Sequence, residues 1–429
     1  GFGEEWKELK KFNNLKDEQR SIVFYAENKA SMNHFRLLIS ELTQKRNFQI
    51  CYITSVKNDP ILSNNDENIF AFYVGDGVIR TKFFLELKAR ILIMDMPDLN
   101  SFHIKRSKVF PVHYIYIFHS MFSVHSYLRK GAVDNFDSIF CVGEHHEKEI
   151  RETERLYGLK RKNLLQYGFG RLDKLLKERE DLKENRTDEK LVIIAPSYGE
   201  KNLLEICGEK LIEILLKENF KVLLRPHYRI LDDSTKLINS IKGKFAKNEN
   251  FIFEEGVIPS ESFHNSKCLI SDWSGISFEY AFVFEKPVIF IDQPLKLNNA
   301  EYSRLESVPL EILLREKIGR ILPAEDIKEL PSVVAELAAS SEDFEMRVKE
   351  LRENFVFNIG NSGARGAEVI KEVANAEKIE DPYNRAERLA TKSAIIFSKL
   401  RAVVDEVETQ ISNDHWSLPR YDQLLLTIS

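Results

Sequence analysis

The sequence has few cysteines, and their spacing forms no recognisable site. Only four occur among 429 residues, at Cys51, Cys141, Cys207 and Cys268. Disulfide frameworks and cysteine-ligated zinc sites need closely spaced or paired cysteines, and isolated cysteines in apolar runs are typical of reducing compartments. We therefore expect a cytoplasmic protein without a structural metal or disulfide.

The sequence also lacks long hydrophobic runs and a strong net charge. No stretch approaches the roughly 18 to 20 apolar residues that a membrane span needs. The formal net charge is −5, which gives no reason to expect nucleic acid as a partner. Residues 4–19 alternate charged and apolar side chains like a short amphipathic helix, whose apolar face fits either packing or contact with a membrane.

Several common catalytic motifs are missing as well. No Walker loop, Gly-x-Gly-x-x-Gly fingerprint, nucleophile elbow or Cys-His pair occurs. These absences argue against the common nucleotide hydrolases, dehydrogenases and acyl transferases.

Apolar, β-rich runs alternate with helical patterns along most of the chain, which predicts an α/β fold. The predicted strands are Ser21–Ala26, Gln49–Thr54, Ile69–Val74, Arg90–Met96, His113–His119, Asp137–Val142, Leu164–Tyr167, Leu191–Pro196, Phe220–Pro226, Asn250–Glu254, Lys267–Asp272 and Pro287–Asp292. The charged stretch 174–190 separates two series of strands and indicates a linker or an exposed helix.

We therefore expect two Rossmann-like, doubly wound domains that face a cleft, flanked by an N-terminal segment and a helical C-terminal extension. The predicted boundaries are 1–19, 20–180, 190–375 and 376–429. In such folds, ligands bind outside the carboxyl ends of the strands. Residues 381–411 are charged and amphipathic, which fits packing or oligomerisation.

The most informative stretch runs from Lys267 to Tyr280. A buried apolar strand stops at Ser271-Asp272-Trp273-Ser274-Gly275-Ile276-Ser277 and is followed by helical spacing with Glu279 one turn in. A helix start offers unpaired N–H groups and partial positive charge, and small residues let a phosphate approach. We expect a nucleotide diphosphate here, with Glu279 accepting hydrogen bonds from its ribose. Many strand-to-helix turns of this kind bind nothing.

A second candidate group ends the strand at Leu224. Arg225 and Arg229 flank His227 there, and two guanidinium groups with one imidazole suit a pyrophosphate or a phosphoryl group in transfer. The alternative is a structural histidine after Pro226.

In the first half, the strand at 113–117 leads to His119. An imidazole has a near-neutral pKa, so His119 is our candidate for the general base that takes the proton of an acceptor hydroxyl. A helix cap is the competing interpretation for His119, and His125 is a weaker candidate.

The sequence gives weaker support for the remaining candidate residues. Arg171 at a helix start can face phosphate while Asp173 fixes its pose, although a capping Asp with an exposed Arg fits equally well. Ser197 ends the first strand of the second series and is expected to lie beside the nucleotide. The pair His145 and His146 lacks the i, i+4 spacing of zinc ligands, and we expect Glu147 and Glu149 on a solvated helix turn.

Together these residues resemble the CDP-glycerol glycerophosphotransferase family of teichoic acid and capsule polymerases, whose catalytic domain has a two-lobed, glycosyltransferase-B-like fold. The similarity runs from about 112 to 363. Residues 271–280 look like the family's Thr/Ser-Asp-Tyr-Ser-Ser-x-x-Phe-Asp-Tyr motif. The further matches are 224–227 to Arg-x-His-Pro with the proline displaced, 168–173 to Gly-Tyr-Pro-Arg-Asn-Asp, 118–121 to Trp-His-Gly-Thr without its Trp, Gly and Thr, and 357–363 to the closing segment.

The resemblance implies a transferase that moves a polyol phosphate from a CDP-activated donor to a hydroxyl of a cell-surface polymer. It assigns the first lobe to the acceptor and the second to the donor. It implies His119 as base, donor contacts from Arg225, His227, Ser274 and Ser277, and neither cofactor nor metal. The partners expected are the donor, a glycan or polymer acceptor and the cytoplasmic face of the membrane.

Three alternatives stay open at this point. A glycosyltransferase using a UDP- or CMP-sugar fits the same pocket, and Glu279 stands where the family usually has Asp. A nucleotide-sugar 2-epimerase shares the small-residue turn but needs further acidic residues. A non-catalytic scaffold for polysaccharide assembly is motivated by the altered 118–121 segment.

Overall fold

The computed structural model describes residues 2–182, 188, 190–255, 260–295, 297–338 and 342–376. Contacts divide the chain into a compact unit of residues 1–369, which holds both sheets, and a second unit that begins at Ile370. The amphipathic stretch 381–411, which we considered for oligomerisation, lies outside the described residues.

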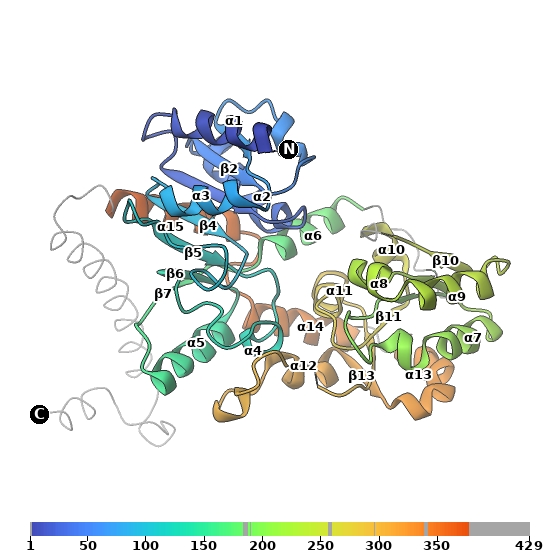
Figure 1. Cartoon of the computed structure of the whole chain (residues 1–429). Helices are drawn as coiled ribbons and strands as arrows, with labels where there is room; N and C mark the ends of the chain where they lie inside the picture. The colour runs from blue at the N-terminus through green and yellow to red at the C-terminus, as the bar shows by residue number, and fades with distance from the viewer. Residues whose placement is uncertain are drawn as a thin grey trace, which may run out of the picture. The chain divides into compact units, whose positions relative to one another are not determined.

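Two parallel sheets form the core of the first unit (Figure 1). The seven-stranded sheet has the order β3-β2-β1-β4-β5-β6-β7, and the six-stranded sheet has the order β10-β9-β8-β11-β12-β13. The strands are β1 (Ile22–Ala26), β2 (Ile50–Thr54), β3 (Ile69–Tyr73), β4 (Ile91–Met94), β5 (His113–Ile117), β6 (Ser138–Cys141), β7 (Asn163–Gln166), β8 (Leu191–Ile194), β9 (Lys221–Leu224), β10 (Phe251–Phe253), β11 (Cys268–Ser271), β12 (Val288–Ile291) and β13 (Gly319–Leu322).

Helices connect these strands and cover the sheets. They are α1 (Phe2–Asn13), α2 (Ser31–Ser40), α3 (Val78–Glu86), α4 (Val124–Tyr127), α5 (Glu144–Tyr157), α6 (Gly170–Glu180), α7 (Glu209–Lys217), α8 (Tyr228–Asp233), α9 (Thr235–Phe245), α10 (Ser260–Asn265), α11 (Ile276–Phe284), α12 (Leu310–Ile318), α13 (Leu330–Ala338), α14 (Glu342–Phe355) and α15 (Ser362–Ala376). Among the described residues, no helix is both long and apolar enough to span a bilayer.

The predicted fold class is confirmed: the chain is α/β, with two doubly wound parallel sheets and helices after the last strand. Central strands such as β1, β4 and β11 are buried at every position, because helices cover both faces of a parallel sheet. Their continuous Val, Ile and Leu runs are the reason that the sequence predicted them.

Two segments at the ends of the first unit pack on the first sheet's side. Leu9 and Phe12 of α1 are buried, and the Phe12 ring contacts the rings of Phe72 and Phe83, so the apolar face of this helix is covered by protein. At the other end, a Cβ on Gly363 of α15 would lie 2.9 Å from a backbone oxygen of α2. A glycine is needed for this close approach.

Candidate functional site

The strand order places the switch point of the second sheet between β8 and β11, where ligands of doubly wound folds bind. Buried side chains tie these two strand ends together. The Asp272 carboxylate accepts the backbone N–H groups of Ser197 at 2.7 Å and Leu203 at 3.0 Å. The Ser271 hydroxyl donates to the carbonyl of Ala195 at 2.7 Å. In the structure, Ser271 and Asp272 therefore shape the turn, and their contact with a ligand stays a prediction.

Helix α11 begins directly after this turn, and no side chain caps it. The backbone N–H and the hydroxyl of Ser277 both donate to the carbonyl of Ser274, at 3.1 and 2.6 Å. Within the described residues, the N–H groups of Ser274, Gly275 and Ile276 have no hydrogen-bond acceptor. Three such donors at the positive end of a helix are chemically suited to an anionic group such as a phosphate, and phosphate binding here stays a prediction.

One turn into α11, Glu279 meets Arg171 of α6. Their side chains form an ion pair at 2.7 Å, and Glu279 is 9% exposed. The carboxylate raises the pKa of Arg171. Oε2 of Glu279 is buried and makes no hydrogen bond to any described residue. Arg171 is thus held beside the α11 tip by an acid, as the sequence suggested, although that acid is Glu279 rather than Asp173.

The second group of candidates follows β9. His227 caps α8, and its Nδ1 accepts the backbone N–H of Arg229 at 3.3 Å. The ring lies 4.7 Å from the ring of Tyr198, and the Arg229 guanidinium lies over the same tyrosine at 4.7 Å. Burial, followed by the charges of Arg229 and Arg225, lowers the pKa of His227 to about 4. The ring is neutral at pH 7, and since Nδ1 accepts, Nε2 carries the proton and can donate to a phosphate oxygen.

His119 follows β5 on the first sheet, and its imidazole has the opposite tautomer. Its Nδ1 lies 3.3 Å from the backbone oxygen of Asp95, which can only accept, so Nδ1 carries the proton and Nε2 keeps its lone pair. His119 keeps solvent-exposed surface, yet many protein atoms lie around its ring and reduce the hydration of a charge there. Burial and the positive charge of Arg229 lower the pKa of His119, and the bond to Asp95 opposes them. A neutral imidazole with a free Nε2 is the form that a general base requires.

Two observations indicate that the segment after β5 lies near the segments after β9 and β11. A Cβ on Gly275 would lie 3.6 Å from the Ser120 hydroxyl, so the residue next to His119 is in reach of the α11 tip. The charge of Arg229 acts on His119, and the charges of Arg171 and Glu279 act on Arg225. Electrostatic interactions therefore link Arg229 with His119 and His227, and Arg225 with His227, Arg171 and Glu279. The helix start at Ser274, Gly275 and Ser277 is connected to this group by the Arg171–Glu279 pair and by the approach of Ser120 to Gly275.

Asp173 lies elsewhere in this arrangement. Its carboxylate accepts the backbone N–H of Gly360 at 2.7 Å and of Ser362 at 2.9 Å, together with the Ser362 hydroxyl. Gly168 has φ +102°, and a Cβ there would lie 2.2 Å from the carbonyl oxygen of Phe357. Two motifs that the sequence presented separately, 168–173 and 357–363, thus pack against each other, and Asp173 fixes the second one.

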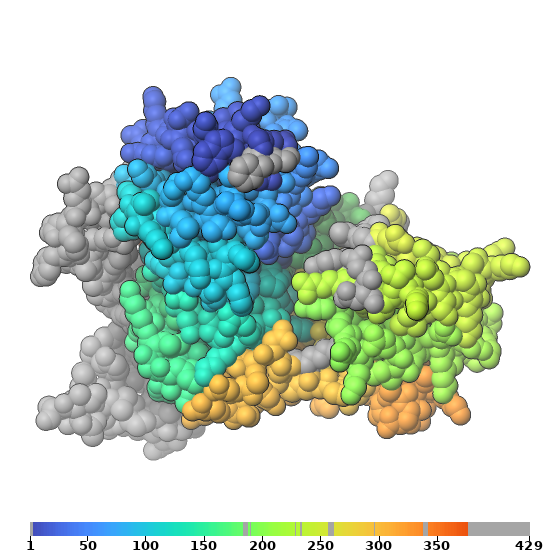
Figure 2. All heavy atoms as spheres, in the orientation of Figure 1, coloured from blue at the N-terminus to red at the C-terminus, as the bar shows by residue number. Residues whose placement is uncertain are grey.

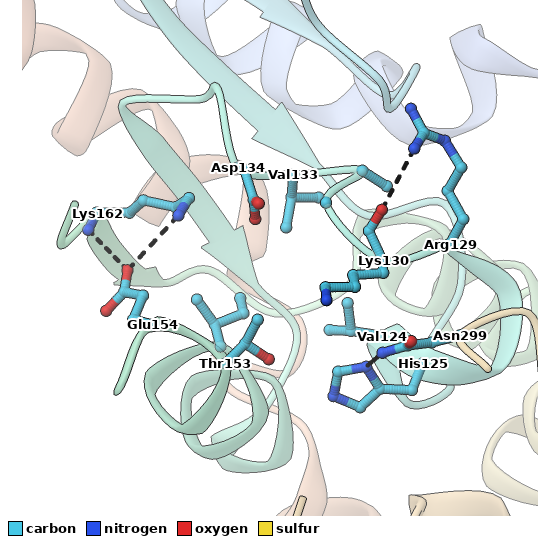
Figure 3. Close-up of a pocket in the computed structure, with 13 residues that line it drawn as sticks. Val124, His125, Arg129, Lys130, Val133, Asp134, Thr153, Glu154, Lys162 and Asn299 are labelled. Atoms are coloured by element: carbon cyan, nitrogen blue, oxygen red, sulfur yellow. Dashed lines mark hydrogen bonds and ion pairs between the residues drawn. The ribbon is translucent and has the colours of Figure 1, made fainter. Parts of the chain in front are cut away.

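Two hollows of the described surface are lined by residues other than those of the α11 tip. A small pocket behind α4 is lined by Val124, His125, Arg129, Lys130, Gly131, Ala132, Val133, Asp134, Ile150, Thr153, Glu154, Lys162 and Asn299 (Figure 3). Nδ1 of His125 lies 2.9 Å from the Asn299 amide nitrogen. His125, a weaker candidate by sequence, is therefore engaged with Asn299 rather than directed at the α11 tip.

Two residues near His119 escaped the sequence analysis. Asp95 follows β4, is 8% exposed, and has a pKa raised by burial to about 7. His34 of α2 is 8% exposed, and its ring lies 6.3 Å from that of His119. Asp95 stands at the carboxyl end of a predicted strand, like His119, and that shared position was the available signal. Among the described residues, no group of three or more His, Cys, Asp or Glu is arranged to hold a metal ion.

Known structures share this fold. UDP-GlcNAc 2-epimerase from Methanocaldococcus jannaschii, in complex with UDP-GlcNAc and UDP, aligns with a TM-score of 0.52 and 14% identity over 82% of this chain and 98% of its own. The S. aureus MnaA-UDP co-structure aligns with a TM-score of 0.53 and 12% identity over 82% and 95%. The wall teichoic acid polymerase TagF gives a TM-score of 0.48 and 13% identity over 89% and 96%. At these identities the likeness to the epimerase and to MnaA concerns the fold alone.

Comparison with curated protein sequences finds no significant match. The sequence does match, over residues 9–372, the family described as CDP-Glycerol:Poly(glycerophosphate) glycerophosphotransferase. This match covers most of the chain and includes every candidate residue named above. The chain belongs to this glycerophosphotransferase family, and the protein is a transferase.

Proposed function

We propose that the protein transfers glycerol phosphate, or a similar polyol phosphate, from a CDP-activated donor to a hydroxyl of a teichoic-acid-like or capsular polymer. The observation that carries the proposal is the approach of the His119-Ser120 segment to the tip of α11, with a Gly275 Cβ position 3.6 Å from the Ser120 hydroxyl. The residue next to His119 thus lies close to the start of α11, whose unpaired N–H groups suit a diphosphate, and this supports His119 as the base.

In this mechanism, His119 Nε2 takes the proton of the acceptor hydroxyl as its oxygen attacks the phosphorus that carries the polyol. The new phosphorus–oxygen bond forms as the bond to the bridging oxygen breaks, and CMP leaves with that electron pair. The α11 tip, Arg225, Arg229 and His227 Nε2–H neutralise charge on the phosphoryl oxygens. Arg171 and Glu279 lie close by, where Glu279 can accept from the ribose and Arg171 can contact phosphate.

We further propose that the reaction needs neither a cofactor nor a metal ion. Three arginines supply fixed positive charge: Arg171 pairs with Glu279 of α11, Arg225 interacts with both of these residues, and Arg229 acts on His227. Guanidinium groups and helix N-termini can supply the stabilisation that divalent cations give in other phosphoryl transferases.

A panel of labelled donors tests the substrate assignment. Purified protein is incubated with an acceptor glycan and with CDP-glycerol, CDP-ribitol, a UDP-sugar or a CMP-sugar, each with and without EDTA, and products are analysed. We expect transfer from a CDP-polyol and a rate unchanged by EDTA. Turnover of a UDP- or CMP-sugar alone would contradict the proposal in favour of a glycosyltransferase, and a lack of affinity for CDP, CMP and UDP would indicate a scaffold.

We also propose that the protein works at the cytoplasmic face of the membrane, and the surface loop 99–112 supports this. Phe102 is 62% exposed, Val109 52% and Phe110 41%, while Lys105 and Lys108 lie among them. No acidic residue occurs from 99 to 133. The loop and α3 line an open hollow. Blue-to-cyan atoms, the colours of this part of the chain, form part of the face shown in Figure 2. Exposed aromatic and basic side chains together favour anionic lipid surfaces.

Vesicle sedimentation tests the loop. The wild-type protein is expected to pellet with phosphatidylglycerol vesicles and much less with phosphatidylcholine vesicles. The double variants Phe102→Ser/Phe110→Ser and Lys105→Glu/Lys108→Glu are each expected to lower the bound fraction several-fold, because they remove the apolar or the electrostatic part. The matched control is Met346→Ala, at another exposed apolar residue (60%). Equal sedimentation of all variants would show that the loop is not a lipid contact.

A further inference from the structure

The four residues that follow Ser120 form a short loop, and each has its backbone bonded to a buried or half-buried ionisable side chain. This loop, 121–124, connects the His119-Ser120 segment to α4. The bonds are His145 Nε2 to the oxygen of Met121 (2.9 Å), His146 Nε2 to the oxygen of Phe122 (2.8 Å), the N–H of Ser123 to Glu311 Oε2 (3.1 Å), and the N–H of Val124 to Glu149 Oε2 (2.8 Å).

The loop-binding side chains lie in the interior rather than on the surface. His146 is 0% exposed, and Glu149 and Glu311 are each 1% exposed. Sequence analysis expected Glu149 on a solvated turn, and this was wrong, because the residue faces the loop one turn into α5. Burying an ionisable group costs free energy unless the group is well hydrogen-bonded. Three buried ionisable groups around one loop therefore indicate that the position of the loop backbone is important.

The chemistry of each partner suits a fixed backbone. The N–H of Val142 donates to Nδ1 of His146 at 3.3 Å, so Nε2 carries the proton and donates to Phe122. Burial lowers the pKa of His146 and keeps the ring neutral. Burial raises the pKa of Glu149 to about 8 and that of Glu311 to about 7. Both carboxyl groups can still accept a hydrogen bond through an oxygen when protonated.

These partners come from two parts of the unit. His145, His146 and Glu149 lie on α5, which follows β6 of the first sheet, whereas Glu311 lies on α12, which precedes β13 of the second sheet. The segment after β5 therefore approaches the second sheet's side at two places. Ser120 lies close to Gly275, which precedes α11, and Ser123 donates to Glu311 of α12.

His119 itself has few restraints of its own. Among the described residues, it forms the 3.3 Å bond to Asp95 and edge contacts with the rings of Tyr127 (4.8 Å) and His34 (6.3 Å). Tyr127 lies on α4, which begins at Val124 where the loop ends. The direction of the His119 ring thus depends on where the loop and α4 are held.

We propose that His145, His146, Glu149 and Glu311 are positioning residues that hold loop 121–124, and through it His119, at a fixed place relative to the α11 tip. Glu311 has a special part in this set, because it links the loop to the second sheet's side of the site. The inference rests on the proposed function in one respect only, namely that His119 is the base.

The test compares Glu311→Ala, Glu311→Gln and Glu311→Met in the full-length protein. Gln keeps an acceptor oxygen of the same shape, whereas Ala and Met remove it, and Met still fills the space. The matched control is Glu154→Ala, which also removes a buried α5 carboxylate that accepts a backbone N–H, from Lys162 at 2.8 Å. The readouts are kcat and KM for the donor, calorimetric affinity for CDP, and hydrogen–deuterium exchange of peptides covering 120–127.

We expect Glu311→Ala and Glu311→Met to lower kcat about 10- to 100-fold, with KM and CDP affinity within about twofold, because a misplaced base slows the chemical step while binding persists. Exchange in 120–127 should rise in both variants. Glu311→Gln should restore kcat to within about threefold of wild type, since it keeps the hydrogen bond. Glu154→Ala should leave kcat and exchange in 120–127 unchanged.

Two results would overturn the inference. Unchanged exchange in 120–127 in Glu311→Met would show that Glu311 does not hold the loop, and raised exchange with an unchanged kcat would show that the loop does not position the base. If Glu311→Ala does not fold, Glu311→Met and Glu311→Gln decide in the same way. Failure of the proposed function looks different, because the wild-type protein would then show no transfer while the exchange comparison still reports on the loop.

Discussion

Replacing His119 by alanine is expected to lower kcat about 10²- to 10⁴-fold, the usual contribution of a positioned general base, with CDP affinity changed by no more than about twofold. Nδ1 of this ring donates to the Asp95 carbonyl, so Nε2 carries the lone pair that can accept a proton. Initial-rate kinetics with the CDP-polyol donor measure the first quantity, and calorimetry measures the second.

The control for this variant is His264→Ala, which removes an imidazole on α10 that has no part in the proposed site. Its kcat should equal that of wild type. A His119→Ala protein that keeps the wild-type rate would remove the base from the mechanism, and the assignment of the acceptor side would go with it.

The pH dependence of the wild-type rate gives a second view of the same ring. A base works in its neutral form, so the rate rises with pH through the pKa of His119 and is constant above it. Burial and the charge of Arg229 lower that pKa, so the acidic limb should lie below the 6.5 of an ordinary imidazole. Arg229→Gln removes one lowering charge and should move the limb to higher pH. A limb that does not move would show that Arg229 does not face His119.

Replacing His227 by alanine is the second large expected loss, about 10²- to 10³-fold in kcat, the usual cost of removing one donor to a developing oxyanion. The proposed donor is Nε2–H, because Nδ1 accepts the N–H of Arg229 and the proton of the neutral ring is therefore on Nε2. His227→Gln places an amide N–H near the Nε2 position and should recover part of the rate. His227→Asn mimics Nδ1 and should not.

The pH profile shows whether His227 acts as a hydrogen-bond donor or transfers a proton. Burial and two neighbouring arginines lower the pKa of His227 to about 4, so the ring stays neutral throughout the working range. Changing His227 should therefore leave the acidic limb of the pH profile in place. Equal activity of the Gln and Asn variants would show that the Nε2 donor is not what matters.

The sequence was most informative where a residue type has a single structural role. Small residues between β11 and α11 predicted an uncapped helix tip, and the structure has one, because Gly275 supplies no side-chain cap. Continuous apolar runs predicted β8, β11 and β12, and these strands are buried at every position, as a strand covered on both faces must be. Such signals are local, so a single sequence contains them.

The sequence was less informative where an acid has two possible partners. Asp173 was expected at the donor site, fixing the pose of Arg171, and Asp272 was expected in the turn that binds the donor. In the structure they accept backbone N–H groups from segments 187 to 189 and 69 to 75 residues away. An aspartate near a Gly-rich turn has the same letters around it in either role. Only the fold decides which backbone groups come within reach, and a ligand role for these two acids stays a prediction.

The sequence analysis missed β13 for a different reason. This edge strand, Gly319–Leu322, has one buried position in four and begins with a glycine. Neither alternation nor a continuous apolar run marks it. Gly319 is nevertheless required, because a Cβ there would lie 1.8 Å from the carbonyl oxygen of Val288 on β12. Tertiary contact, and not local propensity, makes this segment a strand.

The central claim is that His119 and His227 act on a donor whose diphosphate lies at the α11 tip. A crystal structure with CDP-glycerol bound tests it most directly. We expect phosphate oxygens within hydrogen-bond distance of the N–H groups of Ser274, Gly275 and Ile276 and of His227 Nε2. His119 Nε2 should face the phosphorus opposite the CMP oxygen. A diphosphate bound elsewhere, with both imidazoles out of reach of it, would contradict the account.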